Sequence, residues 1–135
     1  MRKRSVAALS AVLGAVALCG VLPGPGPAAG ATAPATSFKD DVLPVFQEHC
    51  LTCHQAPDGQ GYKASGLSLT TYEGVMKGTK FGPMVIAGNP EGSNLMRLLD
   101  WEVSPQLRMP HGAKQLSACD RDAIRTWIRE GAKDN

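Results

Sequence analysis

The sequence has few aromatic residues, no surplus of positive charge beyond its first segment, and no strand-like pattern. Aromatic residues make up 5% of its 135 residues, a length that fits one domain. The formal net charge is +2, but Arg2, Lys3 and Arg4 all lie in the first 31 residues, which contain no acidic residue. Residues 32–135 therefore carry 11 basic and 12 acidic residues, a balance that excludes a basic nucleic-acid-binding protein.

Apolar residues are also scarce outside that first segment. Of the hydrophobic residues, 18 lie in residues 1–31, and the 40 others make up 38% of residues 32–135. This fraction is low for a domain that must bury its own core, so we expect a further component to help fill the interior. The chain shows no internal repeat, no nucleophilic triad and no paired carboxylates.

The first 31 residues have the composition of a signal peptide. A basic start at residues 2–4 precedes the apolar run Val6–Leu22, and Ala29-Gly30-Ala31 fits a cleavage site. We predict a signal peptide over residues 1–31, a flexible tether over 32–36 and one domain over 37–135. Two alternatives are an uncleaved membrane anchor and a lipid attached to Cys19, although Leu18 stands where a small residue is usual. Each predicts export, most simply to the periplasm, where disulfides and covalent cofactor attachment occur.

The pattern of residues 37–135 predicts an all-α domain with long loops. Ser37 and Asp40 indicate a helix over Ser37–His49, which Pro44 should bend or divide. Glycine and polar residues predict a loop over Gln55–Gly66. Thr70-Thr71 should cap a short helix that runs through Met76 and stops at Gly78.

Two further helices are predicted in the second half of the chain. Asn89-Pro90 indicates a helix start, with Asn89 as the N-cap and Leu95, Leu98 and Leu99 as its apolar face. Prolines and Gly112 predict a loop over Trp101–Lys114. The last helix should begin at the cap Ser117 and end at Gly131, with Trp127 packed against the first helix or a cofactor.

Cys50-Leu51-Thr52-Cys53-His54 follows the first predicted helix directly. Cys-x-x-Cys-His is the attachment signature of c-type haem. Two thiols one helical turn apart can form thioether bonds with the two vinyl groups of the porphyrin, and His54 can then bind the iron as the proximal ligand. The other ring nitrogen of His54 should be held by a backbone carbonyl. We therefore predict one covalently attached haem c with its iron.

Three other sites could use the same cysteines. A thioredoxin-type dithiol needs a βαβ setting, which the pattern lacks. A Cys50–Cys53 disulfide would close a loop too small to stabilise the fold much. A zinc site would need Cys119 and one of His49 or His111 as further ligands, at no recognised spacing.

The distal iron ligand must come from another segment, and Met109 is the best placed. It lies in a loop between prolines, and Pro110 restricts it to extended geometry. Its rivals are Met84, which follows Gly82-Pro83, and His111, which would give a His/His site of lower potential. The other candidates, Met76, Met96 and His49, fit less well. Arg108 is expected to contact a haem propionate, with Arg97 and Lys80 as weaker choices.

These segments together resemble a known family. The residues that carry the resemblance are Val45-Phe46, His49-Cys50-x-x-Cys53-His54, Gly66-Leu67-Ser68-Leu69, Gly88-Asn89-Pro90-Glu91, Arg108-Met109-Pro110, Leu116-Ser117, Trp127-Ile128 and Gly131-Ala132. The sequence is similar to a monohaem cytochrome c domain, most of all to the planctomycete-type subgroup. The resemblance implies a class I-like fold in which the first and last helices cross near the haem edge, and it implies Met109 as the distal ligand.

Two residues depart from that family pattern. His111 stands where the subgroup often has a second proline, so a His/His site stays open. Cys119 is unusual near the start of the last helix, and it would be a free thiol once Cys50 and Cys53 carry haem. Its two interpretations are a reactive thiol, activated by the helix dipole, and a small half-buried residue.

We accordingly expect an exported electron carrier and not an enzyme. Redox proteins would dock on the haem edge near Cys50 and Cys53, and neither nucleic acid nor a stable membrane span after leader cleavage is expected. The alternative is a haem enzyme or sensor, such as a small peroxidase, in which Met109 does not bind and His111 acts as a distal base.

Overall fold

The computed structural model describes residues 35–135, and the predicted signal peptide and most of the predicted tether lie outside this range. The described part is helical, as predicted, and holds no strand, only a single bridge between Thr79 and Gly82. Its elements are η1 (Phe38–Val42), α1 (Leu43–His49), α2 (Leu51–His54), α3 (Gln60–Ser65), α4 (Tyr72–Lys77), α5 (Asn94–Leu99), η2 (Pro105–Leu107) and α6 (Ala118–Arg129). None of these helices has the length and apolar character needed to cross a membrane.

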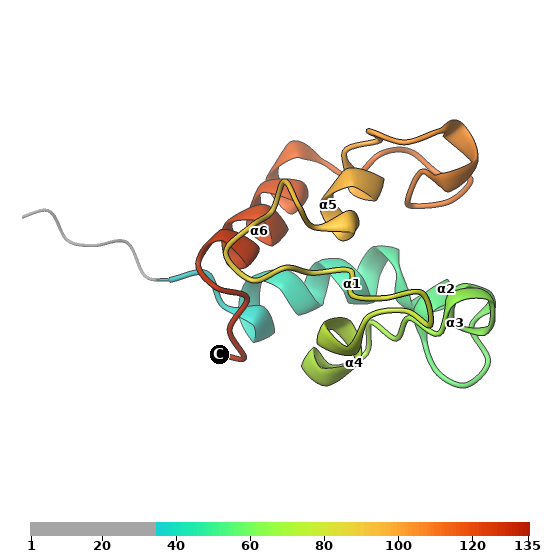
Figure 1. Cartoon of the computed structure of the whole chain (residues 1–135), viewed down its shortest axis with the longest axis horizontal. Helices are drawn as coiled ribbons and strands as arrows, with labels where there is room; N and C mark the ends of the chain where they lie inside the picture. The colour runs from blue at the N-terminus through green and yellow to red at the C-terminus, as the bar shows by residue number, and fades with distance from the viewer. Residues whose placement is uncertain (1–34) are drawn as a thin grey trace, which may run out of the picture. The chain divides into compact units, whose positions relative to one another are not determined.

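The first helical stretch divides at Pro44, as predicted. Ser37 caps it by accepting a hydrogen bond from the Asp40 backbone N–H at 3.1 Å. A π-helical turn, η1, comes first, and α1 then begins with Pro44 in its first turn, where proline's missing N–H costs no helical hydrogen bond. The chain therefore keeps one direction through η1 and α1 (Figure 1).

Four of the predicted helix boundaries, the two ends of α4 and the two ends of α6, agree with the structure to within a residue or two. Thr71 caps α4 through the Gly74 N–H at 3.1 Å, and Gly78 ends that helix. Ser117 caps α6 through the Asp120 N–H at 3.1 Å, and Gly131 follows its C-cap with φ of 104°. These signals are local, so they act whatever the rest of the chain does.

Two predictions about the elements were wrong. The predicted loop Gln55–Gly66 contains the helix α3. Glycine and polar residues disfavour a helix there, but packing against α2, which holds Cys53 and His54, stabilises it. The predicted helix start at Asn89-Pro90 is a turn, in which the Asn89 side chain accepts from the Gly92 N–H at 2.8 Å. The helix α5 begins only after Ser93, five residues into the predicted segment.

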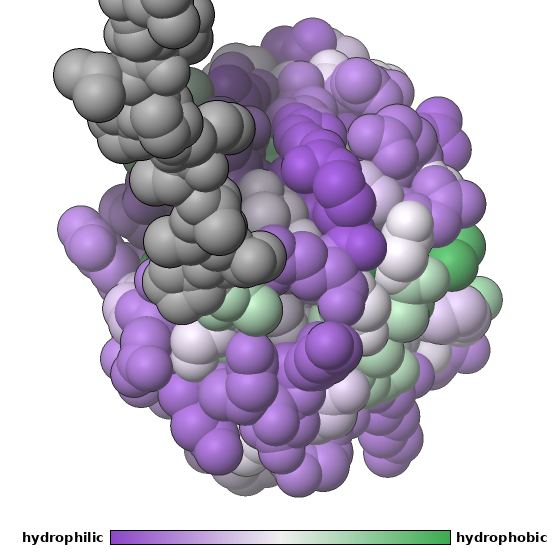
Figure 2. Space-filling model, turned by 90° about the vertical axis from the view of Figure 1, so that its left-hand side faces the viewer, coloured by the Kyte–Doolittle hydropathy of each residue, from purple (hydrophilic) through white to green (hydrophobic). Residues whose placement is uncertain are grey.

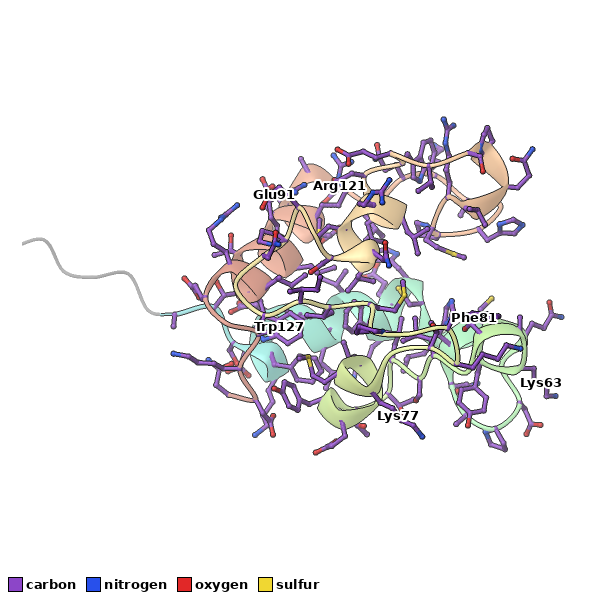
Figure 3. All side chains as sticks on the ribbon, viewed as in Figure 1. Lys63, Lys77, Phe81, Glu91, Arg121 and Trp127 are labelled. Atoms are coloured by element: carbon purple, nitrogen blue, oxygen red, sulfur yellow. The ribbon has the colours of Figure 1, made fainter. Side chains whose placement is uncertain are left out.

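The core joins the two halves of the described chain. In Figure 1, η1 and α1–α4 lie in the lower half, and α5, α6 and the loop 101–117 lie in the upper half. The rings of Phe38 and Trp127 meet at 5.3 Å between centroids, and those of Phe38 and Tyr72 at 5.5 Å. Trp127 thus packs against the first helical segment, as predicted, deep between the halves (Figure 3). The face in Figure 2 is mostly hydrophilic, as expected of the outer surface of such a core.

Candidate haem site

Cys50, Cys53 and His54 lie within one helical turn. Cys50 ends α1 and is the N-cap of α2, and its carbonyl accepts from the N–H of Cys53 at 3.1 Å and of His54 at 2.9 Å. Cys50 is half-buried and Cys53 is exposed, and neither forms a disulfide. The turn thus presents two free thiols and an imidazole together, the arrangement that thioether attachment of haem requires.

The two thiols differ in their surroundings. Burial, and then the neighbouring Cys53, raises the pKa of the Cys50 thiol to about 11. Because the thiolate is the reactive form, Cys50 stays protonated and poorly reactive at neutral pH. Its environment therefore disfavours a spontaneous disulfide with Cys53.

One nitrogen of the His54 ring is held by a backbone carbonyl. Its Nδ1 lies 3.3 Å from the Leu67 carbonyl oxygen, which can only accept, so Nδ1 carries the proton and Nε2 has a free lone pair. The sequence predicted such a carbonyl. Burial lowers the pKa of His54 and outweighs the opposing effect of the Leu67 carbonyl, so the ring is neutral at pH 7, as ligation demands.

Gly61 on α3 lies against the His54 ring. A β-carbon at position 61 would come within 2.7 Å of Cε1 and 2.8 Å of Nε2 of His54, well inside van der Waals contact. Only glycine lets α3 approach the imidazole this closely. Sequence reasoning missed this residue because it treated residues 55–66 as a loop, and no local signal marks the contact.

Met109 lies in the loop 101–117, which occupies the same end of the fold as α2 and α3 (Figure 1). It is half-buried and packs on the margin of the core, as Cys50 does. Its backbone is held on both sides, because its N–H donates to the Leu98 carbonyl at 3.2 Å and its carbonyl accepts from the Trp101 indole Nε1–H at 2.9 Å. The peptide between Met109 and Pro110 is cis.

The rivals of Met109 occupy different surroundings. Met84 is 8% exposed within the hydrophobic core, and its carbonyl accepts from the Leu95 N–H at 2.9 Å. Met96 is also buried in the core, whereas His49 and His111 are exposed. Among these residues, Met109 alone combines a loop position with a place at the margin of the core.

Arg108 has an unsatisfied polar atom that suits a carboxylate. Its Nε is buried and lacks a hydrogen-bond partner, and its guanidinium lies 5.1 Å from the centre of the Trp101 ring. A haem propionate would supply the missing acceptor, so this donor fits the predicted group. Arg97 and Lys80 are exposed, and Lys80 instead lies over the ring of Phe81 at 5.2 Å.

A hollow of about 570 Å³ lies between the end of α1 and the loop that follows Met109. Its lining includes His49, which precedes Cys50, and Pro110, which follows Met109, together with Leu116 and Asp120. The hollow thus adjoins the turn Cys50–His54, where haem is predicted to attach, and the segment around Met109, the predicted distal ligand. Nothing in the sequence alone indicated it.

The competing uses of the cysteines find no support in residues 35–135. This range holds no strand for a thioredoxin-like centre, and no group of three or more histidine, cysteine or acidic side chains is arranged to hold a metal ion as a zinc site would. Cys119 is exposed in the first turn of α6, so the expectation of a half-buried residue was wrong.

Comparison with known proteins gives one match. The model of the family Planctomycete cytochrome C matches residues 50–111, from the first haem-motif cysteine to His111. Neither the curated proteins nor the solved structures contain a significant match. The matched range spans less than half of the chain but holds both the turn Cys50–His54 and the segment around Met109. The resemblance to the planctomycete cytochrome c family, a family of c-type haem proteins, is confirmed over this range.

Proposed function

We propose that this protein is an exported c-type cytochrome that carries single electrons through one covalently attached haem. One observation carries the proposal: two free thiols and a neutral imidazole share a single turn, and the Leu67 carbonyl leaves Nε2 of His54 available. This arrangement suits haem attachment and iron ligation better than it suits a dithiol centre, a disulfide or a zinc site.

Each role in the site has a residue suited to it. Cys50 and Cys53 would hold the porphyrin through thioether bonds, His54 would be the proximal ligand and Met109 the distal one. Arg108, with its unpartnered Nε, would contact a propionate. When bound, haem would supply an iron that alternates between Fe(II) and Fe(III), and His54 and Met109 would be the residues that bind it.

The surroundings favour electron transfer over catalysis. With His54 and Met109 as ligands, no substrate reaches the metal, and the sequence holds neither a nucleophilic triad nor paired carboxylates. Cys53 is exposed, so the porphyrin edge that it holds would face a redox partner across a small, transient contact. The near-neutral charge of residues 32–135 argues against strong steering of one partner.

Export to the periplasm completes the proposal. The basic, apolar and small-residue pattern of residues 1–31 supports a cleaved leader. Export would also place the cysteines in a compartment where disulfides and covalent haem attachment are possible.

The test is expression with a c-type maturation system, followed by a haem-stained denaturing gel and by oxidised and reduced spectra. We expect one haem that survives denaturation, and a weak sulfur-to-iron band at the red end of the oxidised spectrum. That band should disappear in Met109→Ala and persist in Met84→Ala, which removes the rival thioether from the core.

Two results would contradict the proposal in different ways. A protein that releases its pigment into acid acetone has no covalent haem. Covalent haem with high-spin iron that binds carbon monoxide at once would instead favour the enzyme or sensor, in which His111 acts on the open distal side.

A further inference from the structure

The helix α5 ends in an unusual way, beside the Met109 segment. The N–H of Trp101 donates to the Leu98 carbonyl at 3.4 Å, and the N–H of Glu102 donates to the Arg97 carbonyl at 3.0 Å. This pair of hydrogen bonds is the Schellman motif, which places the residue after the C-cap in the left-handed region and usually has glycine there. In α5 that residue is Trp101, with φ of 62°.

The end of α6 has the same motif, with glycine in the left-handed position. The helix α6 closes with the same two bonds, from the Gly131 N–H to Ile128 at 3.0 Å and from the Ala132 N–H to Trp127 at 2.9 Å. Its left-handed residue is Gly131, with φ of 104°. A residue with a β-carbon is disfavoured at this position, so the tryptophan in α5 needs a reason beyond the end of the helix.

Core packing does not supply that reason. Trp101 is half-buried, and it lies outside the cluster of core residues described for residues 35–135. Its two specific contacts both go to the Met109 segment: the indole Nε1–H donates to the Met109 carbonyl at 2.9 Å, and the ring lies under the Arg108 guanidinium at 5.1 Å. Met109 is also tied to α5 directly, through its N–H and the Leu98 carbonyl at 3.2 Å.

We propose that Trp101 is a positioning residue, which fastens the Met109 segment to the end of α5 and so keeps the Met109 thioether on the iron. The inference rests on the proposed distal role of Met109. The left-handed backbone at position 101 turns the indole back toward residues 108 and 109. The hydrogen bond and the stacked guanidinium then restrain the loop against opening, which would let another ligand take the distal position.

The test uses the holoprotein and imidazole as a competing ligand for the ferric iron. Trp101→Phe keeps an aromatic ring at position 101 but replaces the indole and so removes its N–H donor. Loss of a hydrogen bond of ordinary strength should let imidazole bind about five- to tenfold more tightly. The sulfur-to-iron band of Trp101→Phe should also weaken at a lower temperature than in the wild type.

A matched control separates positioning from general destabilisation. Trp127→Phe removes an equivalent bond, from the Trp127 indole N–H to the Lys133 carbonyl at 2.8 Å, in a ring that packs on Phe38 and Tyr72. Its imidazole affinity should stay within about twofold of the wild type, whatever its melting temperature, because distant sites act independently. A second variant, Trp101→Gly, places a residue that tolerates the left-handed backbone at the end of α5 but removes the whole indole. Because the contacts with residues 108 and 109 are lost, it should bind imidazole at least as tightly as Trp101→Phe.

The outcomes distinguish this proposal from the proposed function. If the wild type shows the sulfur band and Trp101→Phe and Trp101→Gly bind imidazole no more tightly, Trp101 does not position Met109 and only this inference fails. If Trp127→Phe gains as much imidazole affinity as Trp101→Phe, the effect is general loosening and the inference also fails. If the wild type lacks the band and binds imidazole as Met109→Ala does, Met109 ligation fails and this inference fails with it.

Discussion

The contact between His54 and Gly61 shows how a single atom can restrict the position of a proposed iron ligand. The Leu67 carbonyl determines which nitrogen of His54 carries the proton, and the missing side chain of Gly61 determines how close α3 approaches the ring. Both constraints act on the same imidazole from residues later in the chain. The ring is thus fixed before any metal binds, which reduces the ordering required on ligation.

Gly61→Ala should displace His54. The new methyl group would lie within 2.8 Å of the ring nitrogen Nε2, so either α3 or the imidazole must move. We expect a shift of reduction potential and a loss of about 1–3 kcal/mol of stability in the holoprotein, the usual cost of overpacking. Protein-film voltammetry and thermal denaturation measure the two effects. Ala64→Gly, an exposed change on the same short helix, is the control and should leave the potential unaltered.

Cys50 should be protected from alkylation in the folded, haem-free chain. Its pKa of about 11 leaves little thiolate at pH 8, so reaction with iodoacetamide should be at least about tenfold slower than in the same chain unfolded in urea. The sign of the shift predicts that the rate in the folded chain rises with pH up to about 11. Peptide mass spectrometry of a Cys119→Ser background follows the reaction, and equal rates in the folded and unfolded chains would contradict the prediction.

Among the helices, those with strong local caps were predicted well and those that depend on packing were not. Ser37, Thr71 and Ser117 each accept a hydrogen bond from a backbone N–H three residues ahead, a contact that the local sequence specifies. Asn89 makes the same kind of contact without starting a helix, because an Asx turn and an N-cap share one residue type. The side chain of Ser93, ahead of α5, bonds instead to Ile86 and Asn89 in the preceding loop.

An ion-pair network joins α5 to α6, and Asp100 is its centre. Both carboxylate oxygens of Asp100 accept from Arg125, at 2.9 and 2.8 Å, and Arg121 lies at 3.7 Å. The hydrogen bond with Asp100 raises the pKa of the Arg125 guanidinium, which stays charged at any pH of interest. The network holds the start of the Met109 loop against the last helix, since Trp101 follows Asp100 directly.

Asp100→Asn should destabilise the holoprotein by about 1–3 kcal/mol, because the half-buried guanidinium groups of Arg121 and Arg125 lose the anion that they share. Asp122→Asn is the matched control on the same arginine. The Asp122 side chain is 73% exposed and lies 3.7 Å from Arg125, so its loss should cost less than about 0.5 kcal/mol. Urea unfolding measures the free energy of unfolding of both variants, and equal losses would contradict the prediction that Asp100 contributes more than Asp122.

The molecule as a whole is closed by residues that meet near the two ends of the described chain. Phe38 packs on Trp127 and Tyr72, and the Tyr72 hydroxyl donates to the Ala132 carbonyl at 2.9 Å. The Lys39 N–H donates to the Asn135 carbonyl at 3.0 Å. This cluster ties η1, α4 and α6 together, so the first and last helical segments contact each other as the family resemblance implied. That they cross near the haem edge stays a prediction.

Phe38→Ala should lower the free energy of unfolding by about 3–5 kcal/mol, the usual cost of removing a buried aromatic ring. Phe81→Ala makes the same chemical change at a side chain that is 82% exposed, compared with 2% for Phe38. Phe81 lies at the end of the molecule near α2 and α3 (Figure 3), and its loss should change stability by less than about 0.5 kcal/mol. Thermal denaturation of the two holoproteins checks the contrast, and similar melting temperatures would contradict it.

Interactions that span a single turn could be predicted from the order of residues: the three capped helices and the grouping of Cys50, Cys53 and His54. They depend on neighbours within a few positions, so composition and spacing are sufficient to find them. The approach of Gly61 to His54, the bond from Trp101 to Met109 and the unpartnered Nε of Arg108 could not be predicted in this way. Each depends on where the chain returns after a turn or a loop, which is set by burial of the common core and not by any local preference.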